Sequence, residues 1–161
     1  MTIWVADADS LIFLAKLGRL NLLSAVGGDI YIPSAVMAEI RAKGDEACAQ
    51  VELAGKSWLR IREVENRETV VLLLADLDPG ESEVITLAKE IHADYVILDD
   101  LDARRFARRV GLSVIGTVGI LLSARLRGEI PSLRDEIGRL QAYAFRISQT
   151  FVEEVLKEAG E

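Results

Sequence analysis

The chain has 161 residues, of which 50% are hydrophobic, and this length predicts one domain, residues 1–161, with a substantial core. Its one cysteine and one histidine exclude an internal disulfide and argue against a zinc or histidine-rich centre, so that any metal would be held by oxygen atoms. The net charge of −7 counts against a nucleic-acid binder unless the acids are concentrated around a divalent cation and arginines elsewhere hold the phosphates.

Strand-like and helix-like segments alternate along the chain. The apolar pattern predicts strands at residues 3–6, 29–32, 58–64, 95–98 and 112–115. Helical spacing predicts two short helices between residues 11 and 26, which end at Gly27 and Gly28, and further helices at 34–42, 45–54, 67–76, 78–92, 100–110, 117–128, 132–143 and 148–158. This alternation is typical of an α/β fold in which a mainly parallel sheet lies between helical layers.

Two aspartates follow apolar strands directly. Asp7 ends the run Ile-Trp-Val-Ala, and Asp99 ends the run Tyr-Val-Ile-Leu. In parallel sheets ligands bind beyond the carboxyl ends of the strands, and neighbouring strands bring these ends together. Asp7 alone could simply cap the helix that follows. A pair of carboxylates in one cleft favours a metal site, because a cation relieves their repulsion.

Glu39 is a third candidate ligand. It lies three residues after Val36, at the border of the apolar face of its predicted helix. An ion pair with Lys43, four residues further on, is an equally good explanation of its presence.

Glu81 and Glu83 compete for a fourth place. Glu81 completes a capping box with Asp78, which would explain it by structure alone. It also shares a helical face with Ile85 and Ala88, whereas Glu83 shares its face with Thr86 and Glu90. The helical phase therefore predicts that Glu81 points inward.

Basic and hydroxyl side chains follow the second aspartate. The predicted helix after Asp100 carries Arg104, Arg105, Arg108 and Arg109. Pairing on the surface, such as Asp100 with Arg104, explains at least two of the four. Arg104 is nearest the acids in sequence and could hold a carboxylate or a substrate phosphate. Thr117 is expected to cap its helix, with its hydroxyl facing the acids as the alternative.

These motifs together resemble the PIN-domain family of metal-dependent ribonucleases. The resemblance covers nearly the whole chain. It is carried by the strand before Asp7, by Ile-Pro-Ser-Ala-Val-Met-Ala-Glu-Ile with Glu39, by Gly-Glu-Ser-Glu-Val-Ile-Thr-Leu-Ala with Glu81, and by Val-Ile-Leu-Asp-Asp-Leu-Asp-Ala-Arg with Asp99 and Asp100.

The resemblance implies a three-layer α/β/α sandwich and a quartet of acids that hold Mg²⁺ or Mn²⁺. The quartet would be Asp7, Glu39, Glu81 and Asp99, in both catalytic and metal-binding roles. Arg104 and Thr117 would border it as substrate-binding residues, and Asp9 and Asp100 are further candidate ligands. Asp9 departs from the family, which usually carries a small hydroxyl or amide residue at that position.

The resemblance also implies hydrolysis of single-stranded RNA by a metal-activated water. Many members are toxins of toxin–antitoxin pairs, so a small antitoxin protein and a homodimer are candidate partners. Because the chain starts without a basic segment and carries no apolar stretch of membrane-spanning length, we expect no signal peptide, no membrane partner and a cytoplasmic location.

Two alternatives remain. A PIN-like interaction module could keep the acids without turnover. Alternatively, Asp7-Ala8-Asp9 matches the Asp-x-Asp of haloacid-dehalogenase-type phosphatases, in which Asp7 would be the nucleophile and Asp9 the acid/base. Helical spacing begins directly after Asp9, however, and leaves no room for the flap that those enzymes insert there.

Overall fold

A computed structural model describes residues 1–26 and 28–161. In this part of the chain, five strands form one sheet in the order β3-β2-β1-β4-β5, and every pairing is parallel. The strands are β1 (Thr2–Ala6), β2 (Gly28–Pro33), β3 (Leu59–Arg62), β4 (Tyr95–Ile97) and β5 (Val114–Ile115). The prediction of an α/β fold with a parallel sheet is confirmed, and the expected break at Gly27 lies outside the described residues.

The helices lie where helical spacing predicts them, with ends that differ by a few residues. They are α1 (Ala8–Lys16), α2 (Asn21–Ser24), α3 (Ser34–Lys43), α4 (Glu46–Ala54), α5 (Arg67–Leu73), α6 (Pro79–Glu90), α7 (Leu101–Arg109), α8 (Thr117–Leu126), α9 (Leu133–Ala142) and α10 (Gln149–Glu158). No helix in the described ranges is long and apolar enough to cross a membrane.

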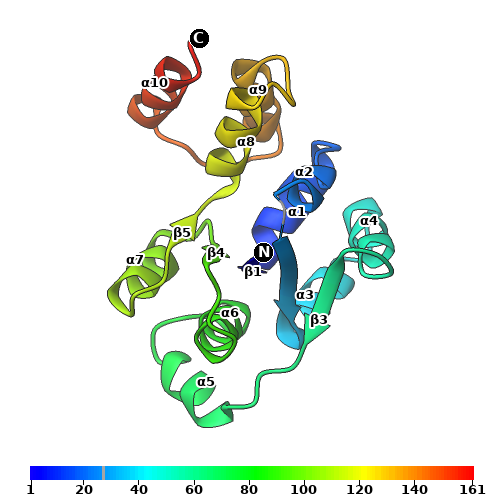
Figure 1. Ribbon diagram of the computed structural model, residues 1–161, viewed down its shortest axis with the longest axis vertical. Coiled ribbons are helices and arrows are strands. Elements are labelled where there is room, and N and C mark those ends of the chain that lie inside the picture. The colour runs from blue at the N-terminus through cyan, green and yellow to red at the C-terminus, as the bar shows by residue number, and fades with distance from the viewer. Residues whose placement is uncertain (27) are drawn as a thin grey trace.

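Helices cover both faces of the sheet. The chain moves from β1 through β2 to β3 in one direction, and then from β4 to β5 on the other side of β1. Because parallel crossovers are right-handed, reversing the direction moves the connecting helices to the opposite face. Accordingly, α5, α6 and α7 lie on one side of the strands, and α1, α2, α4 and α8 on the other (Figure 1).

The core is formed where these layers meet. Ile30, Ile32, Leu87 and Ile97 are among the largest fully buried side chains. Such residues fill both faces of the central strands, as expected for a parallel sheet between helices. The covered sheet leaves its carboxyl edge, where β1 and β4 end beside each other, as the place for a site.

Candidate active site

Asp7 and Asp99 lie side by side at the carboxyl edge of the sheet. The Asp7 amide donates a hydrogen bond to the Ile97 carbonyl oxygen at 3.0 Å, which continues the pairing of β1 with β4. The Asp99 amide donates to Oδ2 of Asp7 at 3.1 Å, and the Ser10 amide donates to Oδ1 of Asp7 at 2.9 Å. Asp7 is therefore the N-cap of α1 and a neighbour of Asp99 at the same time.

The environment of Asp7 disfavours its negative charge. Only 6% of the residue is exposed. Burial and the nearby charge of Asp99 raise the pKa of Asp7 well above its ordinary value, although the hydrogen bonds from Ser10 and from the Asp99 amide lower it. A cation next to this pair would offset both unfavourable effects, because it favours the ionised form.

Asp99 is held by hydroxyl and amide donors. Thr117 donates twice, from its amide to Oδ1 at 2.8 Å and from Oγ1 to Oδ2 at 2.6 Å. Ser10 Oγ donates to Oδ2 at 3.2 Å. Thr117 is the first residue of α8 and Gly116 is the N-cap, so the expectation that Thr117 caps this helix is wrong. Its side chain is fully buried and faces Asp99.

A narrow acidic cleft of about 10 Å³ opens next to Asp7. It is lined by Asp7, Ala8, Asp9, Glu39, Asp78, Gly80 and Glu81. The start of α6 borders the cleft because α6 runs back from the carboxyl edge of the sheet towards the start of β4. A Cβ atom at Gly80 would lie 2.9 Å from Oε2 of Glu39, so glycine at this position lets the carboxylate approach the helix.

Besides Asp7, three acids of the cleft have pKa values raised above their ordinary range. Burial, followed by the charge of Asp99, raises the pKa of Asp9. Burial, followed by the charges of Asp78 and Asp9, raises the pKa of Glu39. Burial raises the pKa of Glu81 to about 7, with a smaller contribution from the charge of Asp78. The cleft therefore concentrates negative charge at one point, which is the condition for cation binding.

Arg104 lies on the other side of Asp99. Its Nη1 donates to the Leu98 carbonyl oxygen at 3.1 Å, and both Nη1 and the Asp99 carboxylate lie close to Gly116. Burial is the main cause that lowers the pKa of Arg104, and the carboxylates of Asp99 and Asp7 act in the opposite sense. A guanidinium beside the acid pair can donate charge-assisted hydrogen bonds to an anion.

Asp100 caps α7 and does not lie in the cleft. Its Oδ2 accepts from the Ala103 amide at 2.9 Å, and the residue is exposed. No ion pair joins it to Arg104 within the described residues, so the pairing expected from their spacing is wrong. The cause is that Asp100 bonds to the helix start while Arg104 turns towards Leu98. Arg105, Arg108 and Arg109 are exposed, and Arg105 pairs with Asp102 at 3.8 Å.

One family model matches residues 3–161, and its description reads DUF3368, PIN domain. The chain belongs to the PIN-domain family. No curated protein matches it.

Two solved structures show the same fold. The first is a PilT N-terminus domain protein, SSO1118, from the archaeon Sulfolobus solfataricus P2, with a TM-score of 0.58 and 19% identity over 76% of this chain and 92% of the other. The second is the PIN-domain endonuclease Utp24, with a TM-score of 0.52 and 11% identity over 71% of this chain and 84% of the other.

In this PIN domain, Glu81 of α6 is half-buried and Glu83 of the same helix is buried. Glu81 borders the acidic cleft, as the helical phase predicts. Glu83 is only 6% exposed, accepts from the Ala35 amide at 3.1 Å and pairs with Arg67 at 2.8 Å. The expectation that Glu83 shares an outward face is wrong, because the neighbouring helices α3 and α5 both pack against α6.

The donors around the cleft fit a hard divalent cation in kind, since carboxylate oxygens are what Mg²⁺ and Mn²⁺ prefer. The orientation of the side chains is a separate matter. Among residues 1–26 and 28–161, no three Asp, Glu, His or Cys side chains lie close enough to one another to hold a metal ion. Glu81 instead accepts from the Asp78 amide at 3.2 Å, and Asp99 is bonded to Ser10 and Thr117.

Two residues of this site were missed by reasoning from sequence. Ser10 has a signal in its spacing, because it lies one helical turn after Asp7 and so returns to the same edge. Asp78 was explained by its N-cap role, which the structure shows, yet it also lines the cleft. Finally, α1 begins at Ala8, which leaves no place for the flap of a phosphatase after Asp9.

Proposed function

We propose that this chain is a metal-dependent endoribonuclease that hydrolyses phosphodiester bonds of single-stranded RNA. Membership of the PIN-domain family supports a nuclease-type function. The observation that carries the proposal is the meeting of Asp7 and Asp99 at the ends of neighbouring strands, beside a cleft in which the pKa values of Asp9, Glu39 and Glu81 are raised. Such a concentration of unfavourable charge is typical of functional sites.

In this proposal, Asp7, Glu39, Glu81 and Asp99 hold Mg²⁺ or Mn²⁺, and Asp9 is an additional ligand. When bound, the ion activates a water and neutralises charge on the phosphate as the bond is cut. No side chain needs to act as a nucleophile.

In this proposal, the neighbouring residues position the acids and the substrate. Thr117 and Ser10 fix the carboxylate of Asp99 by hydrogen bonds, so that it does not rotate away from Asp7. Arg104, held by the Leu98 carbonyl oxygen, presents a cation to a phosphate next to Asp99. Asp100 has no ligand role in this proposal, because its carboxylate is bonded to the start of α7.

The test is an RNA cleavage assay with Mn²⁺, with Mg²⁺ and with EDTA. We expect cleavage of a single-stranded RNA with either ion and none in EDTA, and no effect of a zinc-selective chelator. Asp7→Asn should abolish cleavage, whereas the control Asp102→Asn should not, because 81% of the Asp102 side chain is exposed on α7. Equal cleavage in EDTA would overturn the metal mechanism.

The same assay separates the proposed enzyme from a non-catalytic PIN module, which would bind the ion without cleaving RNA. A role as the toxin of a toxin–antitoxin pair, in the cytoplasm and with a small antitoxin protein as partner, is a further part of the proposal. It rests on the family resemblance, as does a homodimer. Growth arrest on expression, abolished by Asp7→Asn, is the result expected of a toxin.

A further inference from the structure

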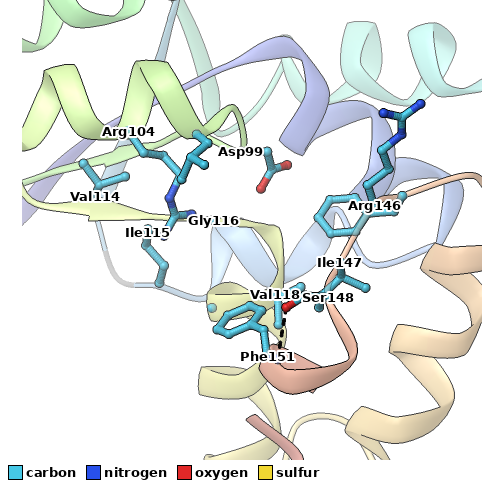
Figure 2. A pocket seen from close by; sticks show the side chains of 13 residues that line it. Asp99, Arg104, Val114, Ile115, Gly116, Val118, Arg146, Ile147, Ser148 and Phe151 are labelled. Atoms are coloured by element: carbon cyan, nitrogen blue, oxygen red, sulfur yellow. Dashed lines mark hydrogen bonds between the residues drawn. The ribbon is translucent and has the colours of Figure 1, made fainter. Parts of the chain in front are cut away.

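A larger cleft adjoins Asp99 on the side away from the acidic cleft. Its volume is about 570 Å³, within the range of about 300–1,000 Å³ typical of ligand sites. Residues near the starts of α7 and α8 form one wall. Residues 145–151, which end the connection from α9 and begin α10, form the other (Figure 2). The cleft therefore joins the carboxyl edge of the sheet to a segment more than forty residues further along the chain.

The second wall is fixed by packing and hydrogen bonds. The ring of Phe145 packs edge-on against Phe13 of α1, with centroids 5.0 Å apart, and the Phe145 amide donates to the Leu140 carbonyl oxygen at 3.1 Å. Ser148 Oγ accepts from the Phe151 amide at 3.2 Å and so caps α10. Because both ends of the segment are tied to helices, the cleft is a formed feature of the fold.

The cleft offers positive charge at two places. Arg104 and Arg146 both line it and are drawn on opposite sides of Asp99 in Figure 2. Arg146 is exposed and takes part in none of the ion pairs formed by the described residues. In a chain of net charge −7, two arginines that line one cleft point to an anionic ligand.

The cleft also offers an apolar surface suited to a flat ring. Phe151 is 42% exposed and Leu101 is 57% exposed, and Ile147 lines the same cleft. Exposed aromatic rings are the platforms on which the bases of single-stranded nucleic acids stack, whereas the bases of a duplex are already stacked on one another. The cleft therefore offers arginines for the phosphate of a nucleotide and an aromatic ring for its base.

We propose that this cleft holds the nucleotide next to the phosphodiester bond that is cut, with its base against Phe151 and its phosphate facing Arg146. The inference rests on the proposed nuclease function, because that function makes the anionic ligand a nucleic acid. It assigns to residues 145–151 the selection of single-stranded substrates.

The experiment compares matched variants of the full chain. Phe151→Leu removes the ring but keeps apolar volume, and Tyr143→Leu is its control because Tyr143 has the same 42% exposure and lies outside the cleft. Arg146→Gln removes a charge in the cleft, and Arg105→Gln removes one just outside it. Affinity for a fluorescein-labelled single-stranded oligoribonucleotide is read as Kd from anisotropy in EDTA and as KM for cleavage in Mn²⁺.

We expect Phe151→Leu to weaken affinity about fivefold or more, since loss of one stacked base costs on the order of 1 kcal/mol or more. Phe151→Trp should retain the affinity of the wild type. Arg146→Gln should lower the slope of log Kd against log salt concentration by roughly 0.7, the value for one phosphate of a single strand. Both control variants should stay within a factor of two of the wild type.

The outcomes separate the two proposals. If the wild type cleaves RNA and neither Kd nor KM changes in Phe151→Leu and Arg146→Gln, the cleft proposal is overturned and the nuclease proposal stands. If the wild type binds RNA through Phe151 and Arg146 but does not cleave it with Mn²⁺, the cleft is supported and the nuclease is overturned. A wild type that neither binds nor cleaves RNA overturns both.

Discussion

Oδ2 of Asp7 accepts a hydrogen bond from the backbone amide of Asp99 at 3.1 Å, so one acid of the site holds the main chain of the other. The Asp7 carboxylate cannot move away from the main chain of Asp99 without breaking this bond, and Thr117 and Ser10 hold the Asp99 carboxylate beside it. Their mutual repulsion is therefore built into the folded chain, and it has consequences that can be measured with and without a metal ion.

Mn²⁺ should stabilise the wild-type protein against thermal unfolding more than it stabilises Asp7→Asn. A ligand that binds only the folded state adds about 2.7 kcal/mol at a free concentration of 100 times its Kd. Melting curves of both proteins with and without Mn²⁺ give the measurement, with Asp102→Asn as the control. Equal shifts for wild type and Asp7→Asn would show that Asp7 is only a helix cap.

Without metal, the protein should lose stability as the pH rises from about 4.5 through about 7. The pKa of Glu81 is raised from 4.5 to about 7 in the folded chain, so the folded state binds this proton more tightly than the unfolded state. The stabilisation is complete below pH 4.5 and is lost as pH passes 7. Urea unfolding in EDTA at several pH values measures it.

Glu81→Gln should flatten this pH dependence between pH 5.5 and 7.5, because glutamine does not titrate and its Oε1 can still accept the Asp78 amide. Part of the slope should remain, since the raised pKa values of Asp7, Asp9 and Glu39 act in the same sense. An unchanged slope in the variant would remove Glu81 as the main cause.

Substitution of Glu81 should affect cleavage, whereas substitution of Glu83 should affect stability. Glu81→Gln should lose metal-dependent cleavage and keep its stability. Glu83→Ala should lose about 1–3 kcal/mol of stability, because the half-buried Ala35 amide loses its acceptor and Arg67 loses its partner. Cleavage rates and urea unfolding of both variants provide the comparison, and the opposite ranking would show that the cleft is wrongly assigned.

Thr117→Val should reduce cleavage without altering the fold. The substitution conserves shape but removes the 2.6 Å bond from Oγ1 to Asp99, and hydrogen bonds to charged groups contribute about 1.5–3 kcal/mol. Thr117→Ser retains the hydroxyl and should keep most of the activity. If valine and serine give the same rate, the hydroxyl does not position Asp99.

Local patterns predicted the elements and the meeting of Asp7 with Asp99, because a strand that ends in an acid is visible in a short stretch of sequence. The burial of Glu83 was not predictable in this way. A helical phase assumes one apolar face, whereas α6 is covered by the sheet and by α3 and α5. Thr117 shows a different limit, since one residue separates an N-cap from a first helical residue and only one of them faces Asp99.

The cleft next to Asp99 had no signal in the sequence at all. Arg146 lies in a connection and Phe151 at a helix start, and both are far from Asp99 along the chain. Tertiary packing brings them to Asp99, and the packing of Phe145 on Phe13 joins segments 132 positions apart. Pairings of this kind come from tertiary packing, and periodicity does not encode them.

The separation of 92 positions between Asp7 and Asp99 also bears on synthesis at the ribosome. A growing chain displays Asp7 early, but its partner strand β4 is made only after more than half of the protein, and the holding residue Thr117 only after two thirds. Until β4 inserts beside β1, Asp7 and Asp99 are not held together and the site is not formed. A chain with the proposed ability to cut RNA would therefore stay inactive next to the message that encodes it until synthesis is well advanced.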